Sequence, residues 1–224
     1  MLTLTILEIV LGIDNIIFIS ILSQKLPAGQ RDKARRLGLG LAVVSRLVLL
    51  FSILILTELT ATLFTVFGHA LSIRDLILIG GGLFLLAKST HEIHTNIEAP
   101  GETKPEKAPG TFLSVVAQIT VLDIVFSIDS VITAIGMAQQ VQIMAVAIVL
   151  AVGLMLLMAK SISDFVERHP TFKVLALSFL LLVGVALIGE GFELHIPKGY
   201  IYFAMGFSFF VELLNMKMRR RAPV

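Results

Sequence analysis

The sequence predicts an all-α polytopic membrane protein, with seven transmembrane helices arranged as a 3+3 inverted-topology repeat plus one C-terminal helix. Three observations predict it. The chain is 56% hydrophobic and 15% charged, with a mean hydropathy of +0.93, whereas soluble domains average about 25% charged residues. Seven apolar segments approach the roughly 20 residues that cross a bilayer as a helix. One short acidic motif occurs twice, in spans that are an odd number apart.

The seven expected spans are separated by proline, glycine and charged residues, which are typical of connections. They lie near residues 2–22, 37–56, 76–87, 112–137, 141–158, 174–188 and 199–214. The third and sixth are short by hydropathy, so we expect them to extend into their polar flanks. Together the spans form a single transmembrane domain, residues 1–224, made of a first three-helix repeat (1–90), a cytoplasmic linker (91–110), a second three-helix repeat (111–191), and a seventh helix with a basic tail (192–224).

The basic residues predict the orientation. Of the 18 Lys and Arg residues, 15 fall in the first, third and fifth connections and the C-terminal tail, and only Arg74 and Lys198 fall in the others. Because short cytoplasmic loops carry an excess of Lys and Arg, we expect the N-terminus outside and the C-terminus in the cytoplasm. A cleaved signal peptide is not expected, since the N-terminus lacks a basic region.

The repeated motif carries the chemistry. Residues 7–15 (LEIVLGIDN) return as residues 122–130 (LDIVFSIDS), with five of nine positions identical. Carboxylates are costly in hydrocarbon, so they usually mark an ion, proton or substrate pathway. Because the two spans run in opposite directions, the copies are expected to meet near the bilayer midplane, where inverted repeats build their sites. The candidate site residues are Glu8, Asp14, Asn15, Asp123, Asp129 and Ser130.

Helical geometry divides these residues between two faces. At about 100° per residue, Glu8 and Asn15 align on one face, as do Asp123 and Ser130, while the remaining acid of each motif lies on the adjacent face. The helices are either regular, or broken at Gly12 or Ser127 to free carbonyl oxygens, and the sequence leaves both open.

Arg46, midway along the second span, is the expected charge partner of Asp14 or Asp129. One arginine does not neutralise four acids, which disfavours a purely structural network of ion pairs, although that alternative stays open.

Carboxylates with Asn and Ser oxygens suit hard cations such as Mn²⁺, Mg²⁺ or Ca²⁺. The chain has no cysteine, so disulfides and thiolate zinc sites are excluded. No prosthetic group is expected. Metal and protons would compete for the same carboxylates, because burial and like charge both favour protonation.

Other polar residues give weaker signals. Lys88 and Glu190 fall at comparable places near the ends of the third and sixth spans, and Glu212 and Asn215 share a face of the seventh, so all four are candidates for the pathway. The segment 91–94 (HEIH) lacks the zinc-protease spacing and is interpreted as a solvated linker.

The motifs 7–19 (LEIVLGIDNIIFI) and 122–134 (LDIVFSIDSVITA) closely resemble the TerC integral membrane protein family, named for tellurium resistance. The resemblance extends to residues 164–170 (DFVERHP) and 197–205 (PKGYIYFAM), and points to the short, membrane-only branch. It implies a bacterial inner-membrane protein and manganese(II) export through the motif residues named above. The residues alone support only a hard cation.

We therefore expect a secondary transporter exporting Mn²⁺, with the lipid bilayer, a divalent cation and protons as counter-ion for partners, and no nucleic acid. A homo-oligomer is left open. The rivals are transport of Ca²⁺ or another ion, tellurium oxyanion handling, a membrane scaffold, and an intramembrane hydrolase. Oxyanions are disfavoured because acids repel them. No nucleophile–base–orienter set supports an enzyme.

Overall fold

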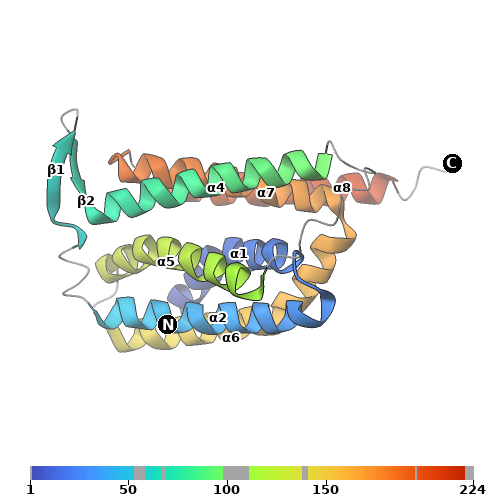
Figure 1. Ribbon diagram of the computed structural model, residues 1–224, viewed down its shortest axis with the longest axis horizontal. Coiled ribbons are helices and arrows are strands. Elements are labelled where there is room, and N and C mark those ends of the chain that lie inside the picture. The colour runs from blue at the N-terminus through green and yellow to red at the C-terminus, as the bar shows by residue number, and fades with distance from the viewer. Residues whose placement is uncertain are drawn as a thin grey trace.

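The computed structural model describes residues 2–52, 59–66, 69–97, 111–137, 141–194 and 196–219. In these residues the chain folds into seven long helices and one β-hairpin (Figure 1). The elements are α1 (Leu2–Ser23), α2 (Ala28–Phe51), β1 (Thr62–Val66), β2 (His69–Ser72), α4 (Ile73–Ile97), α5 (Phe112–Met137), α6 (Val141–Arg168), α7 (Pro170–Gly191) and α8 (Lys198–Arg219).

The helices lie side by side along the long axis of the molecule (Figure 1). We call one end of this axis the elbow end, because the chain reverses there at residues 24–27 and again at His169. Proline sets both reversals, since Pro27 precedes α2 and Pro170 opens α7, where its missing N–H costs nothing. The opposite end, which carries β1 and β2, is called the hairpin end.

The most extensive helix contacts join the first half of the chain to the second. The helix α1 packs against α6, α2 against α5, and α4 against α7. A buried apolar cluster fills these interfaces, with Leu22, Leu39, Ile119 and Leu177 each 1% exposed. The interior of each half is therefore completed by the other half.

The α4–α7 interface depends on two glycines. A Cβ atom added to Gly82 would lie 2.5 Å from the Gly184 carbonyl oxygen, and one added to Gly184 would lie 3.0 Å from the Gly82 carbonyl oxygen. The two backbones thus touch at this crossing. Small residues allow such close approach between membrane helices.

The β-hairpin corrects the expectation of an all-helical chain. Strands β1 and β2 are antiparallel, with Val66 opposite His69 and a register irregularity between Thr62 and Phe64. The run 62–66 (TLFTV) is rich in β-branched and aromatic residues, which favour strands. Ser72 then caps α4, because its Oγ accepts a hydrogen bond from the Asp75 N–H while Asp75 accepts one from the Ser72 N–H, a capping box.

Several helices run further than hydropathy predicts. The helix α4 continues to Ile97, so residues 91–97, expected as linker, are helical, and residues 98–110 lie outside the described residues. The helix α6 continues ten residues past the expected end at 158, which places Lys160 and Arg168 on a helix instead of in a loop. Helical turns with polar residues lower the mean hydropathy at the end of a span. A helix end that is predicted from hydropathy therefore falls before the observed end.

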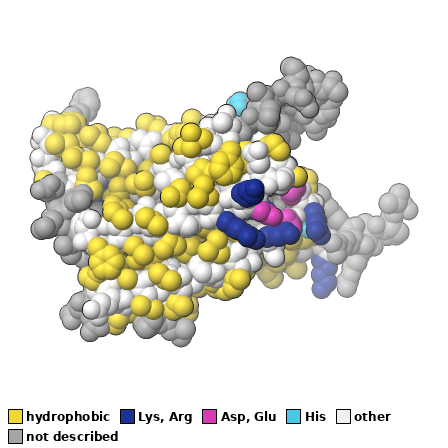
Figure 2. Space-filling model, turned by 60° about the horizontal axis from the view of Figure 1, so that its bottom comes forward, with side chains coloured by type: hydrophobic (Ala, Val, Ile, Leu, Met, Phe, Trp, Pro, Cys, Tyr) yellow, Lys and Arg dark blue, Asp and Glu magenta, His cyan; other side chains and the backbone are white. Residues whose placement is uncertain are grey.

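The surface fits a membrane environment. Among the described residues, four helices are long and apolar enough to cross a bilayer: Ile73–Thr95, Val141–Arg168, Pro170–Gly191 and Gly199–Met218, and α5 carries a shorter apolar stretch, Phe112–Ile128. Figure 2 shows a mostly apolar face with basic and acidic side chains gathered toward one end.

Candidate functional site

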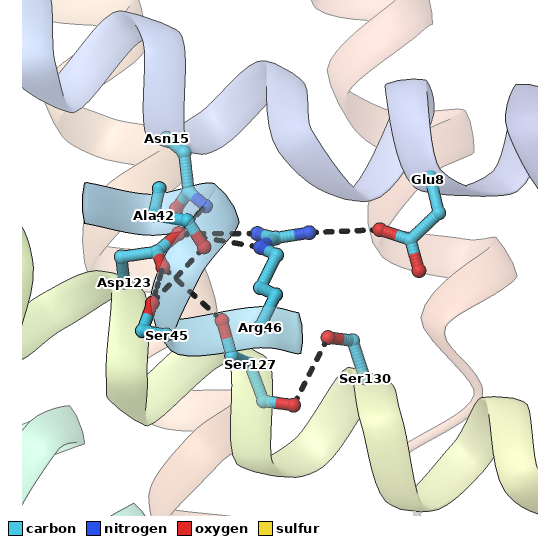
Figure 3. A network of polar contacts seen from close by, with 8 residues as sticks. All are labelled: Glu8, Asn15, Ala42, Ser45, Arg46, Asp123, Ser127 and Ser130. Carbon is cyan, nitrogen blue, oxygen red and sulfur yellow. Dashed lines mark hydrogen bonds and ion pairs between the residues drawn. The ribbon is translucent and has the colours of Figure 1, made fainter. Parts of the chain in front are cut away.

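A buried polar network lies where α1, α2 and α5 meet (Figure 3). Glu8 and Asn15 come from α1, Ser45 and Arg46 from α2, and Asp123, Ser127 and Ser130 from α5. Apart from Ser45, which is partly exposed, each of these residues is at most 7% exposed. Both copies of the acidic motif therefore contribute to one site.

Arg46 lies between two carboxylates of this network. Its Nη1 donates to Glu8 Oε2 at 2.8 Å, and its Nη2 lies 3.2 Å from Asp123 Oδ1. The Arg46 side chain is 3% exposed. Figure 3 shows the guanidinium spanning the gap between the two acids, one from each copy of the motif.

Asp123 is the centre of the network. Its Oδ1 also accepts a hydrogen bond from Asn15 Nδ2 at 2.9 Å, and its Oδ2 accepts from Ser45 Oγ at 2.9 Å and Ser127 Oγ at 3.3 Å. Ser130 donates instead to the Ser127 carbonyl oxygen at 3.2 Å. Asp123 thus has four polar partners, as a buried carboxylate requires.

The helices that carry the motif are regular. Both α1 and α5 run without interruption through Gly12 and Ser127, which decides between the two geometries that the sequence leaves open. The predicted faces are confirmed for α1, where Glu8 and Asn15 both point toward the α2–α5 side. Side chains on one helical face, not freed backbone carbonyls, form this network.

The charges of the network do not cancel. Glu8, Arg46 and Asp123 together carry a formal charge of −1 when all are ionised. Buried charges are tolerated when they are paired and hydrogen-bonded, and removing one partner leaves the others uncompensated. Arg46 therefore holds the network together, and with both acids ionised it offsets only one of the two negative charges.

Two of the six predicted site residues cannot be placed as ligands. The backbones of Asp14 and Asp129 lie in α1 and α5, but their side chains lie outside the described residues. Among the described side chains, no three His, Asp or Glu residues come together as a metal-binding group.

Sequence comparison decides the family. Residues 1–222 match the family described as "Integral membrane protein TerC family". The chain belongs to the TerC family. It is 56% identical over 222 residues to the UPF0053 inner membrane protein YgdQ of Escherichia coli K12, covering 99% of this chain and 93% of that protein. It is 57% identical over 219 residues to a UPF0053 protein of Haemophilus influenzae, covering 97% and 92%.

A longer relative matches as well. The UPF0053 inner membrane protein YoaE of Escherichia coli K12 is 52% identical over 221 residues, which are 98% of this TerC chain but 43% of that protein. No solved structure matches. The chain is thus an integral membrane protein of the TerC family, as its motifs predict.

Three of the four predicted pathway residues, Glu190, Glu212 and Asn215, make contacts outside the network. Glu190, on α7, lies 3.6 Å from Arg74 Nη2 near the hairpin end. Glu212 accepts a hydrogen bond from Asn215 at 3.3 Å on α8, which confirms that these two share a face. Lys88 is partly exposed on α4. None of these contacts joins the network in the described part of this TerC chain.

A second set of charges ties the halves together at the elbow end. We call Lys25, Arg31, Glu92, Glu167 and Lys173 the elbow cluster. Lys25 pairs with Glu92, and Arg31 Nη1 lies 2.8 Å from Glu167 Oε1. Lys173, on α7, lies within reach of the charges of Glu92 and Lys25. Glu92 is 8% exposed, so the expected solvated linker at 91–94 is corrected to a helix whose acid is buried and paired.

Sequence reasoning missed Ser45, which donates to Asp123. The signal was present, since Ser45 and Arg46 are adjacent polar residues in the apolar run 41–50 (LAVVSRLVLL).

Proposed function

We propose that this TerC protein is a secondary transporter that exports a divalent metal cation across the bacterial inner membrane, with Mn²⁺ as the first candidate cargo. The observation that carries the proposal is the joining of the two acidic motifs in one buried network, Glu8 and Asn15 of α1 with Asp123 of α5. Intramembrane acids that face the protein interior are typical of ion pathways.

The pattern of helix contacts supports a 3+3 inverted repeat with α8 added. Exchanging α1 with α5, α2 with α6 and α4 with α7 turns the α1–α6 interface into the α5–α2 interface and leaves α4–α7 unchanged. All three are the most extensive interfaces of the molecule. A seven-span chain built this way places its cation site where the repeats meet.

The basic residues support a cytoplasmic elbow end. Lys25, Arg31, Arg35, Arg168 and Lys173 all lie at this end, and Arg74 lies near the hairpin end. By the positive-inside rule the N-terminus is then outside and the C-terminus in the cytoplasm. Cations would enter from the elbow end and leave at the hairpin end.

Arg46 gives the proposal a mechanism. Its guanidinium lies between Glu8 and Asp123, where a hard cation with oxygen ligands would bind. A cation and Arg46 therefore compete for the same carboxylates, and Asp14 and Asp129 are the proposed additional ligands. Movement of Arg46 back between the acids would help to expel the cation. Protons are the proposed counter-ion. A buried carboxylate that contacts neither the cation nor Arg46 is neutralised by binding a proton.

The test is manganese(II) flux into proteoliposomes, with competing Ca²⁺ and an imposed pH gradient. We expect saturable flux that is lost in Glu8→Gln, Asp14→Asn, Asp123→Asn and Asp129→Asn. The matched control is Asp164→Asn, which removes an acid from α6 outside the network and keeps flux. Competition by Ca²⁺ sets the selectivity, and dependence on the pH gradient tests the coupling. Absence of flux for every ion, from protein shown by circular dichroism to be folded, refutes transport.

The ion pairs themselves favour a second candidate, a membrane scaffold in which Arg46 simply pins α1 to α5. This candidate predicts that a neutral set of similar shape, Glu8→Gln with Arg46→Met and Asp123→Asn, preserves function in cells. A transporter loses function in the same variant. Enzymatic turnover is not part of either proposal.

A further inference from the structure

Basic side chains gather where the elbow-end parts of α2 and α6 meet. Residues 31–36 of α2 (RDKARR) hold four basic residues and one acid. The charges of Arg36 and of Lys160, which is on α6, both act on the Asp32 carboxylate of α2, so both basic side chains lie close to this carboxylate. Figure 2 shows basic and acidic side chains gathered at one end of the apolar face. We call Lys33, Arg36 and Lys160, which are all exposed, the basic surface.

The nearby acids leave the basic surface positively charged. Two of these acids form ion pairs with other residues, Asp32 with Arg35 and Glu167 with Arg31. The members of the basic surface form no ion pair within the described part of the chain. Asp164, on α6, is the acid that remains in these parts of the two helices. Three basic side chains are therefore offset by a single carboxylate.

Toward the hairpin end, the exposed side chains that follow the basic surface are apolar on both helices. They include Leu37 and Val44 of α2, and Leu150 and Leu157 of α6. The two helices pack against each other, and on both of them apolar side chains give way to basic ones near Asp32. In a membrane protein such a boundary lies at the level of the lipid headgroups, because Lys and Arg keep their charged ends in the polar layer. The basic surface is therefore within reach of lipid phosphates.

We propose that the basic surface binds the headgroup of an anionic phospholipid, with its phosphate between Arg36 and Lys160 and its acyl chains along Leu37 and Leu157. A phosphodiester anion accepts charge-assisted hydrogen bonds from guanidinium and ammonium groups. A zwitterionic lipid carries its own cation, which the excess positive charge repels. The bound phosphate offsets repulsion between basic residues of the two halves, and thus stabilises the α2–α6 contact. The site is separate from the transport proposal and does not depend on it.

Native mass spectrometry of the full chain tests this site. The purified protein is incubated in detergent with equal amounts of phosphatidylglycerol and phosphatidylcholine that carry the same acyl chains, and the retained lipids are counted. We expect preferential retention of phosphatidylglycerol. Arg36→Gln and Lys160→Gln should each lower this preference about five-fold, which is the contribution of one basic residue near an anionic surface.

Arg168→Gln is the matched control. Arg168 is also exposed at the elbow end of α6, but it lies seven residues after Ser161 and so on the side of the helix that borders α1, α7 and α8. This variant removes the same charge and should keep the preference. The midpoint of thermal unfolding, followed by circular dichroism, gives a second readout. Phosphatidylglycerol should raise the wild-type midpoint more than phosphatidylcholine does, because a ligand of the folded state stabilises it, and Arg36→Gln with Lys160→Gln should abolish this difference.

Four results would overturn the proposal. The first is equal retention of the two lipids by the wild-type protein, and the second is an unchanged preference when Arg36 and Lys160 are both replaced. The third is an equal loss of preference in Arg168→Gln, which would show that the whole elbow end attracts anionic lipid without a defined site. The fourth is displacement of the retained lipid by inorganic phosphate, which would assign the basic surface to a free anion.

Discussion

Replacing Arg46 by methionine tests the charge balance of the buried network. The substitution keeps much of the side-chain volume but leaves Glu8 and Asp123 without their shared cation. The side chains involved are 3% exposed for Arg46, 3% for Asp123 and 9% for Glu8, so water does not replace the lost partner. Removing one member of a buried pair costs about 3–5 kcal/mol. For a chain of this size, that loss lowers the midpoint of thermal unfolding by about 6–20 °C.

The assay is far-ultraviolet circular dichroism of protein in one detergent as temperature rises. Glu167→Gln is the control, because it removes an ion pair with Arg31 that is 28% and 49% exposed and such pairs contribute about 0–1 kcal/mol. Combining Arg46→Met with Glu8→Gln and Asp123→Asn removes the uncompensated charges and should recover at least half of the loss. An Arg46→Met protein as stable as wild type would refute the reasoning, as would a triple variant less stable than the single one.

Two other predictions concern packing and the elbow end. Gly82→Ala should lower the free energy of unfolding by about 1–3 kcal/mol, because its Cβ meets the Gly184 carbonyl oxygen. Gly80→Ala, whose Cβ meets nothing within 4 Å, is the control and should not destabilise the protein. Unfolding by urea or by heat compares the two variants. Lys25→Glu and Glu92→Lys should each lower the free energy of unfolding by about 1–2 kcal/mol. The double variant, which swaps the two charges, should recover part of this loss in a double-mutant cycle. A double variant with no recovery would show that the ion pair contributes nothing to stability.

The part of the site that could be predicted follows from helical geometry. Residues seven apart share a helical face, and this places Glu8 and Asn15 on the same side of α1. The sequence also identifies Arg46 as the charge partner within the spans. It does not identify which acids Arg46 contacts, because that depends on the rotation of α2 against α5. Arg46 pairs with Glu8 and Asp123, while the expectation for Asp14 and Asp129 stays a prediction.

The features that could not be predicted from the sequence depend on contacts between segments that are far apart in the chain. Glu92 reads as a solvated acid because its partner, Lys25, lies 67 residues away. The hairpin strand 62–66 is short, and hydropathy of a membrane chain is dominated by helices. The network residue Ser45 is one of many serines in apolar surroundings, and only the position of Asp123 gives it a role. Tertiary context therefore decided each of these cases.

The pairing of helices across the two halves has a consequence for biogenesis. When the ribosome has delivered α1, α2 and α4 to the membrane, none of the three has the neighbour that covers it, since α1 awaits α6, α2 awaits α5 and α4 awaits α7. Arg46 likewise waits for Asp123, 77 residues later in the chain. The newly inserted first half must therefore be sheltered by the insertion machinery or by lipid until synthesis is nearly complete. A truncated chain ending after α4 should be a substrate for membrane proteases.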